Sequence, residues 1–374
     1  MVRTFAAIDV GSFELEMGIY EISDKNGVRA IDHVKHMIAL GRDTFSDGKI
    51  SYQMVEETCR VLQDFARIME GYRVSDYRAY ATTAMREAKN SQIVLEQIRV
   101  RTGIHVRVIS NSEQRFISYK AVALKDAEFQ KTIQKGTAIV DVGFGSVQIS
   151  LFDKDALVST QNMPLGVLKL RAALSQVSAS THLEQELVRE LVDNELVTFR
   201  KMYLKDRNIR NLIAVGDPIL NLYYKMHANR RGERLTREQF DEMYQWLLGK
   251  SRNQLEEALD INGEYASLMF PTAAIFHRVL EMTGAENIWV PGIRMGDGIA
   301  AEYAEEKKLI KFNHSFSNDI IAASRNMAKR YKCHMPHVQA VETAALKVFD
   351  SLKKFHGMKS RERLLLQIAA DLDP

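Results

Sequence analysis

Two stretches of the chain repeat the same order of apolar and polar positions. In the first, the apolar run Phe5–Val10 is followed by Gly11 and then by alternating apolar and acidic residues over Leu15–Ile22. In the second, the apolar run Thr137–Val142 leads into another glycine-rich turn, and alternation resumes over Val147–Leu151. A period of two is typical of a half-buried strand. The pattern therefore predicts two strand-turn-strand units that start about 130 residues apart, a domain-sized period.

The segments after each unit change between strand-like and helix-like spacing. Further strands are predicted over residues 28–40, 77–83, 106–109, 156–161, 212–215 and 287–290. Helices are predicted over residues 52–69, 93–101, 112–124, 183–203, 217–226, 237–248, 265–282 and 295–307. Strands and helices in both halves predict an α/β fold made of two duplicated lobes with a cleft between them.

The C-terminal section has apolar spacing of the helical kind only, over residues 320–331, 337–352 and 360–372. We therefore expect an N-terminal lobe over residues 1–125, a second lobe over 126–310 and a partial, all-helical domain over 311–374.

Composition narrows the class of protein. The 51 basic and 48 acidic residues of this 374-residue chain nearly cancel, which argues against nucleic-acid binding. The basic run 229–234 is interpreted as a solvated loop. Two cysteines favour a reducing, cytoplasmic location over a disulfide framework. We expect no signal peptide and no membrane span, since no run reaches the ~18 apolar residues that a spanning helix needs.

The two turns carry residues suited to phosphate chemistry. Glycine and small polar residues after a strand present backbone N–H groups that can surround an anion. Asp9 and Asp141, near the strand ends, are candidate ligands for Mg²⁺, which prefers hard oxygen donors. The alternative is that each turn is an ordinary hairpin turn. Two copies in matching positions favour phosphate binding.

Four motifs occur in an order that resembles the Ppx/GppA family of exopolyphosphatases and guanosine pentaphosphate phosphohydrolases, members of the actin, sugar-kinase and Hsp70 superfamily. The motifs are Asp9–Ser12, Ala81–Asn90 around Arg86, Val108–Gln114 and Ile139–Ser146, with Pro164–Gly166, Val215–Gly216 and Gly292–Gly296 extending the match. The resemblance covers about residues 3–306. It implies two actin-like (ribonuclease H-like) lobes, a polyphosphate or guanine-nucleotide ligand, possible Mg²⁺ and a possible homodimer.

The C-terminal section resembles the start of the HD-type helical domain found in longer members of the family. His337 and the stretch Leu352–Gly357 carry this similarity. The family's His-Asp pair is expected after Ala370, where the chain instead reads Asp371-Leu372. A hydrolytic HD site is therefore not expected, and ordinary surface or core histidines are the favoured interpretation.

The chain departs from the family where the chemistry is decided. Relatives have two adjacent glutamates after the third motif, the second taken as the catalytic base, whereas this chain has Glu113 followed by Gln114. Relatives also have glutamate at the position of Gln148. An amide cannot accept a proton at neutral pH, and losing a general base costs about 10²–10⁴-fold in rate. Glu113 is a poor substitute because adjacent helical residues point about 100° apart.

Other departures change the turns themselves. Phe13 and Glu14 replace phosphate donors, and Glu16 replaces a basic residue. Pro218 has no N–H to offer a phosphate, and Phe144 places a large side chain where relatives have glycine.

Several candidate ligands remain. For phosphate they are Gly11, Ser12, Arg86, Gly143, Gly145, Ser146 and Gly216, and for a metal ion Asp9 and Asp141. Arg86 could grip a phosphate with its guanidinium group or form a salt bridge with Glu87 or Asp141.

Three functions therefore compete. The first is a phosphoanhydride hydrolase acting on polyphosphate or guanosine pentaphosphate, with slow or lost turnover. The second is a pseudoenzyme that acts as a phosphate or nucleotide sensor or as a protein-interaction regulator. The third, least favoured, is a sugar or acetate kinase of the same superfamily.

Overall fold

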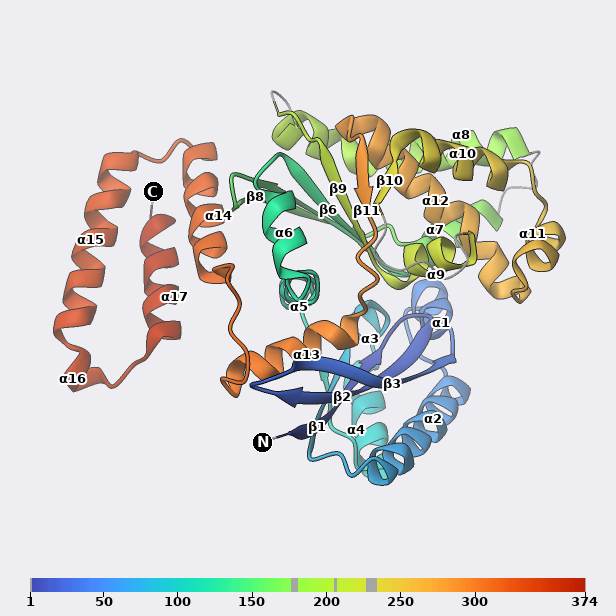
Figure 1. The fold of residues 1–374 in the computed structure, drawn as a ribbon, viewed down its shortest axis with the longest axis horizontal. Coiled ribbons are helices and arrows are strands. Elements are labelled where there is room, and N and C mark those ends of the chain that lie inside the picture. The colour runs from blue at the N-terminus through green and yellow to red at the C-terminus, as the bar shows by residue number, and fades with distance from the viewer. Residues whose placement is uncertain (1, 176–180, 205–206, 227–233, 374) are drawn as a thin grey trace.

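The computed structural model describes residues 2–175, 181–204, 207–226 and 234–373 (Figure 1). Residues 229–233 of the basic run lie outside these ranges. The α/β class is confirmed, because two separate mixed sheets form with helices on their faces. None of the helices within the described ranges is long and apolar enough to span a bilayer.

The first lobe is built on a five-stranded sheet in the order β3-β2-β1-β4-β5. Its strands are β1 (Arg3–Val10), β2 (Glu14–Ser23), β3 (Gly27–Met37), β4 (Asp76–Ala81) and β5 (Val106–Val108). Its helices are α1 (Leu40–Asp47), α2 (Tyr52–Gly71), α3 (Thr83–Glu87) and α4 (Ser91–Thr102). β1 pairs antiparallel with β2 and parallel with β4, so the first unit is a hairpin at the centre of the sheet.

The second lobe repeats this arrangement in a six-stranded sheet ordered β10-β11-β9-β6-β7-β8. Its strands are β6 (Thr137–Val142), β7 (Val147–Asp153), β8 (Ala156–Met163), β9 (Asn211–Val215), β10 (Arg234–Thr236) and β11 (Asn287–Trp289). Its helices are α7 (Val167–Ser175), α8 (Thr181–Phe199), α9 (Asp217–Met226), α10 (Arg237–Leu248), α11 (Arg252–Leu259) and α12 (Gly263–Thr283), and a π-helical turn, Arg200–Leu204, follows α8. β6 pairs antiparallel with β7 and parallel with β9, as β1 does with β2 and β4.

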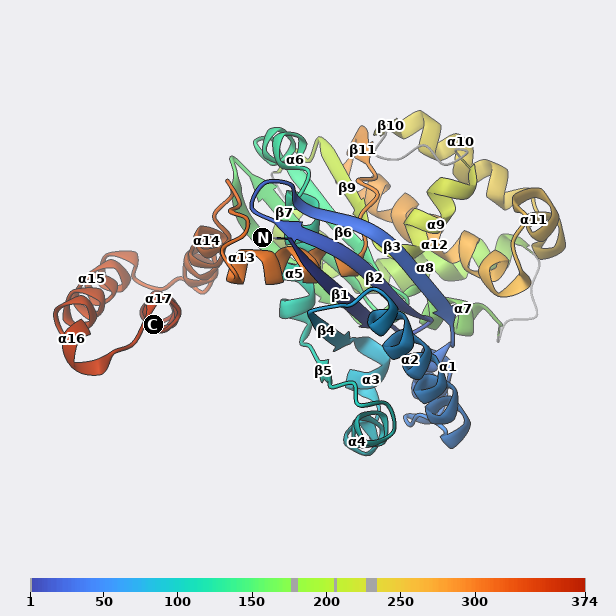
Figure 2. The ribbon, with the colours of Figure 1, turned by 60° about the horizontal axis from the view of Figure 1, so that its bottom comes forward.

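Alternation along β1 explains how the first sheet is covered. Ala6, Ile8 and Val10 pack in one cluster with the buried faces of α2 and α4. Phe5 and Ala7 point to the opposite face, where they pack with α13 (Met295–Glu306). Figure 2 shows α2 and α4 on one side of this sheet and α13 on the other. Both faces of the central strand are therefore buried.

Helix α5 (Asn111–Ala123) contacts both lobes, whereas α6 (Asp126–Ile133) packs on the second sheet. Ile117 of α5 packs with the first sheet, whereas Tyr119 and Val122 pack against the second sheet. α13 contacts α5 and strands β1 to β3, although its sequence position falls within the predicted second lobe. The predicted boundaries at residues 125 and 310 stay predictions.

The C-terminal section is helical, as expected. It contains α14 (Phe316–Arg330), α15 (Met335–Ser351), α16 (Lys353–His356) and α17 (Ser360–Asp371). α14 packs on β8, and α17 packs between α14 and α15. His337 is half exposed, with Nε2 at 3.7 Å from Asp373 Oδ2, and His356 Nε2 lies 2.8 Å from the Phe349 carbonyl. The histidines of the HD-like stretch thus serve local contacts.

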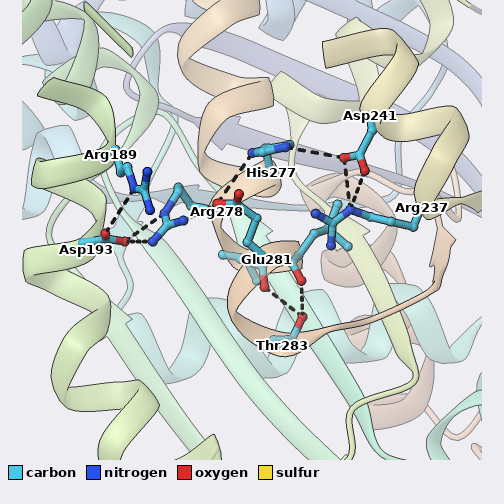
Figure 3. Close-up of polar contacts among 10 residues, drawn as sticks. Arg189, Asp193, Arg237, Asp241, His277, Arg278, Glu281 and Thr283 are labelled. Carbon is cyan, nitrogen blue, oxygen red and sulfur yellow. Dashed lines mark hydrogen bonds and ion pairs between the residues drawn. The ribbon is translucent and has the colours of Figure 1, made fainter. Parts of the chain in front are cut away.

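A polar network joins three helices on the outer side of the second lobe (Figure 3). Arg278 of α12 pairs with Asp193 of α8. His277 stacks on Tyr244 of α10 with ring centroids 4.1 Å apart, and its Nε2 lies 3.5 Å from Asp241 Oδ1. The charges in this network are paired with one another, so it fastens helices together.

Candidate functional site

The two hairpins bring their aspartates to one cavity between the lobes. In the first sheet Asp9 lies opposite Glu16, and in the second Asp141 lies opposite Gln148. The cavity has a volume of about 60 Å³, which is room for a few water molecules. The predicted site residues that line it are Asp9, Gly11, Ser12, Gln114, Asp141, Gly143, Gly145, Ser146 and Gly216.

Backbone hydrogen bonds close the two turns in the same way. The Gly11 N–H donates to the Glu14 carbonyl at 3.0 Å, and the Gly143 N–H donates to the Ser146 carbonyl at 2.9 Å. A Cβ atom at Gly11 would lie only 2.7 Å from the Glu14 carbonyl oxygen, so the turn excludes other residues. Gly216 has φ of 109°, and a Cβ atom there would lie 2.3 Å from the Val142 carbonyl oxygen. Glycine is thus required at the cavity wall.

Aromatic packing holds the turns together across the lobes. Phe13 is fully buried, and it packs in the hydrophobic core of the second lobe although it belongs to the first turn. Its ring centroid lies 5.0 Å from that of Phe144 in the other turn and 5.4 Å from that of Tyr265 in α12. Thr83 Oγ1 lies 3.3 Å from Ser146 Oγ beside this contact. The lobes are therefore in contact at the turns.

Acidic side chains dominate the cavity wall. Burial raises the pKa of Asp9 well above its ordinary value, and the carboxyls of Asp217 and Glu16 raise it further. Burial and Glu14 raise the pKa of Glu16 to about 7, against the lowering effect of Arg294. Burial, followed by Glu16, also raises the pKa of Asp217 well above its ordinary value. These carboxyls repel one another and would repel an incoming polyanion.

Asp141 is better accommodated than Asp9. Burial raises the pKa of Asp141, but the Ser118 hydroxyl donates a hydrogen bond to Asp141 Oδ2 at 2.7 Å and Arg115 lies nearby, and both contributions lower it. Asp9 Oδ1, in contrast, is buried and accepts no hydrogen bond.

Gln114 and Gln148, which stand where relatives have glutamate, differ in their contacts. Gln114 lines the cavity, with a buried Oε1 that accepts no hydrogen bond. Gln148 is buried beside the cavity, where its Oε1 accepts from Arg115 Nε at 3.2 Å. Glu113 lies outside the cavity, because it caps α5 through the Ser110 N–H at 2.9 Å and pairs with Arg107 at 2.6 Å. Its carboxylate is therefore not placed to replace the missing base.

Arg86 also turns away from the cavity. Its guanidinium donates to the Ile109 carbonyl at 2.7 Å and to Thr83 Oγ1 at 3.0 Å, and it contacts Asn111. The expected salt-bridge partners are not used: Glu87 pairs with Lys169 at 3.0 Å and Asp141 with Ser118. Arg86 thus fastens the α3 segment to the start of α5.

Arg294 is a cavity residue that the sequence did not single out. It stands immediately before α13 and lines the cavity near Glu16 and Asp217. Its position in the loop after β11, which is parallel to β9, could have identified it, because ligands gather beyond the carboxyl ends of parallel strands.

The described side chains do not form a preassembled magnesium site. The carboxylates offer hard oxygen donors, and Asp9 Oδ1 lacks a partner. Within the described ranges, however, no three histidine, cysteine, aspartate or glutamate side chains are grouped so that they could hold a metal ion. Magnesium therefore stays a proposal.

Two duplicated lobes, each with a glycine turn and an aspartate facing a shared cavity, define a protein with the two-lobed, actin-like architecture. The family model of the Ppx/GppA phosphatase family matches residues 19–302, so the chain belongs to that family.

Similar proteins agree with this assignment. Exopolyphosphatase 1 of Mycobacterium tuberculosis is 23% identical over 189 residues, which cover 50% of this chain and 54% of that protein. A bifunctional 3-dehydroquinate synthase/phosphatase of Fusobacterium nucleatum is 20% identical over 171 residues, covering 44% of this chain and 25% of that protein. The chain therefore spans about half the length of the first of these relatives and a quarter of the second.

Solved structures share the fold. The Ppx/GppA family member of Aquifex aeolicus aligns with a TM-score of 0.68 and 20% identity over 84% of this chain and 100% of that one. An exopolyphosphatase from Cytophaga hutchinsonii aligns with a TM-score of 0.71 and 17% identity over 82% of this chain and 99% of that one. The actin-like, two-lobed architecture is therefore confirmed.

Proposed function

We propose that this chain is a Ppx/GppA-family protein whose hydrolysis of polyphosphate or guanosine penta- or tetraphosphate is slow or lost. The observation that carries the proposal is Gln114, an amide that lines the cavity beside Asp9 and Asp141 where the resemblance places a catalytic base. Losing a general base costs about 10²–10⁴-fold in rate. The acidic wall and the small volume work in the same direction.

The test is phosphate release from polyphosphate and from guanosine pentaphosphate, with Mg²⁺ and with a chelator. Gln114→Glu, alone and with Gln148→Glu, should raise the rate about 10²-fold if the carboxylate alone is missing. Gln161→Glu makes the same change on β8 and should leave the rate unchanged, because Gln161 does not line the cavity. Wild-type turnover equal to that of the Gln114→Glu variant would contradict the proposal.

A second candidate function, a pseudoenzyme that regulates through protein contacts, is favoured by the contact between Phe13 and Phe144. Their rings pack together between the turns and border the cavity where a phosphate would meet backbone N–H groups. Ligand-induced thermal stabilisation by either phosphate compound would favour a sensor, and its absence together with absent turnover would favour the regulator.

We also propose that the protein is cytoplasmic and forms a homodimer. The free thiols of Cys59 and Cys333 agree with a reducing compartment.

A further inference from the structure

Four acidic side chains of the cavity lining come from β1, β2 and the start of α9. Glu14 and Glu16 alternate on β2 and so point to the same face of the sheet, and Asp217 begins α9 across from them. All three line the cavity together with Asp9. Glu14 is 3% exposed, Glu16 6% and Asp9 9%. We call these four residues the acidic end.

Unpartnered acceptors point into this space. Three buried side-chain atoms that line the cavity accept no hydrogen bond: Asp9 Oδ1, Glu14 Oε2 and Gln114 Oε1. Among the described residues, no buried donor without a partner lines it. Leaving a buried acceptor unpaired costs about 1–3 kcal/mol. Among the side chains of the described lining, acceptors rather than donors are left unpaired, whereas Gln148 Nε2, beside the cavity, is a buried donor without a partner.

The charged side chains that line the cavity are also mostly acidic. The described lining contains five carboxyl groups, the acidic end plus Asp141, and Arg294 as its basic side chain. Lys35 approaches from β3, but its Nζ already pairs with Glu14 Oε1 at 2.9 Å. His33 Nε2 lies 3.1 Å from Glu16 Oε2, and burial, with Arg294 and Lys35, lowers the pKa of His33 to about 4, which leaves the ring neutral at pH 7. Because the pKa of Glu16 is raised to about 7 and those of Asp9 and Asp217 are raised as well, protons neutralise part of this negative charge, and a bound cation would take their place.

Size and donor number identify the kind of cation. A polyphosphate would bring charge of the wrong sign, and the described side chains offer no group of three metal ligands. A primary ammonium carries three N–H donors on one compact centre. The acidic end presents two unpaired acceptors, Asp9 Oδ1 and Glu14 Oε2, and Gln114 Oε1 lines the same cavity. The cavity volume of about 60 Å³ admits such a head group.

We propose that the acidic end of the cavity binds a primary ammonium group, supplied by a small amine or by the lysine side chain of a partner protein. The cleft of this chain has thereby changed from anion to cation recognition. This inference goes beyond the proposed function, because it requires neither phosphate binding nor hydrolysis.

The test compares cations in a phosphate-free buffer at constant ionic strength. Ethylammonium should raise the unfolding temperature of the wild type saturably. Tetramethylammonium, which has the charge without N–H donors, should not, and Mg²⁺ should act weakly. The double variant Glu14→Gln, Asp217→Asn should weaken ethylammonium binding at least tenfold by calorimetry. It should fold, because it removes charges that repel one another.

The control is Glu21→Gln, which makes the same change on β2 outside the cavity, where Glu21 pairs with Arg29. This variant should bind ethylammonium like the wild type. Equal responses to ethylammonium and tetramethylammonium would overturn the proposal, as would a double variant that binds normally. A stronger, saturable response to Mg²⁺ would replace the ammonium site by a metal site.

Two further probes distinguish the sources of the ammonium group. Tighter binding of 1,4-diaminobutane than of a lysine-containing tetrapeptide would identify a small amine, and the reverse would identify a partner's lysine. Because phosphate release is not measured, failure here leaves the hydrolysis test unaffected.

Discussion

The two turns that face the cavity share a backbone and differ in chemistry. Each joins antiparallel strands, and each is closed by a glycine N–H that donates to a carbonyl three residues on. In the first turn, Asp9 Oδ1 accepts no hydrogen bond and Asp9 lies opposite Glu16. In the second, Asp141 is hydrogen-bonded to Ser118 and lies opposite the neutral Gln148.

This difference shows which part of a duplicated site is constrained by folding. The glycines are held by close contacts with the backbone, so the turn shape persists. The side chains opposite each aspartate make no such contact and are free to change in charge. Beside Asp9 the first turn has the acidic Glu16, whereas beside Asp141 the second has the neutral Gln148.

The largest effect on stability is expected for the two phenylalanines of the turns, Phe13 and Phe144. Phe13→Ala should cost about 3–5 kcal/mol of unfolding free energy, because Phe13 is fully buried in the core of the other lobe. Phe144→Ala should cost less, about 2 kcal/mol, because Phe144 borders the cavity and its ring therefore has fewer packing contacts to lose. Urea unfolding of both variants measures the difference.

Phe13→Leu serves as the control for shape, since it keeps most of the apolar volume and should cost about 1 kcal/mol. Equal costs for Phe13→Ala and Phe144→Ala would show that Phe13 does not join the lobes.

A smaller effect is expected at the two aspartates. Asp9→Asn should stabilise the fold at pH 8 by on the order of 1 kcal/mol, because it removes a buried charge that its neighbours repel. The pKa of Asp9 is raised in the folded state, so the wild type loses stability as pH rises above the unfolded value near 3.9. The gain from Asp9→Asn should therefore grow with pH, which chemical denaturation at pH 5 and pH 8 measures.

Asp141→Asn is the matched variant in the second turn. The variant loses a charge-assisted hydrogen bond from Ser118 and the attraction of Arg115. These losses offset the gain from removing a buried charge, so the free energy of unfolding should stay nearly unchanged. A stabilisation as large as that of Asp9→Asn would mean that the turns do not differ in this way.

Sequence periodicity was sufficient for the long elements and for the equivalent positions of Asp9 and Asp141 near the ends of β1 and β6, because strand alternation and repeated motifs are local signals. It missed the short helices α1, α3, α6, α7, α11 and α16 and the short strand β10. α1 has no capping side chain before it, which explains the omission. α11 begins with a capping box of Ser251 and Gln254, a sequence signal that predicts the start of a helix.

The remaining site features depend on tertiary packing. Spacing places a side chain on a face of its own element, but it does not say that Phe13 enters the core of the opposite lobe. Nor does it say that Arg86 bonds the Ile109 carbonyl instead of facing the cavity. These directions follow from how the lobes meet, which no local pattern encodes.

The smallest effect concerns the outer hairpins of the two sheets. In the first lobe the β2–β3 turn is exposed, whereas in the second Asp155 of the β7–β8 turn lies 3.1 Å from His314 Nδ1. His314 Nε2 lies 2.6 Å from Asp319 Oδ2, and Asp319 Oδ1 accepts from the Leu157 N–H at 3.1 Å. His314 thus fastens the C-terminal helices to the second sheet.

This contact should depend on pH. Burial alone would lower the pKa of His314, but the hydrogen bond and charge of Asp319, together with Asp155, raise it above its ordinary value. Its contribution is therefore complete below the unfolded value near 6.5 and is lost as pH rises through the folded value. His314→Gln should destabilise the protein by roughly 1 kcal/mol at pH 6 and by less at pH 9, by denaturant unfolding.

His337→Gln, in the same C-terminal section, is the control. His337 is half exposed, and its distance of 3.7 Å to Asp373 Oδ2 is too long for a hydrogen bond, so the change should be small at both pH values. If the two variants had the same pH profile, the dependence would arise from the segment as a whole. A profile confined to His314 would show that the outer hairpin of the second lobe, unlike that of the first, holds the C-terminal helices through a charged imidazole.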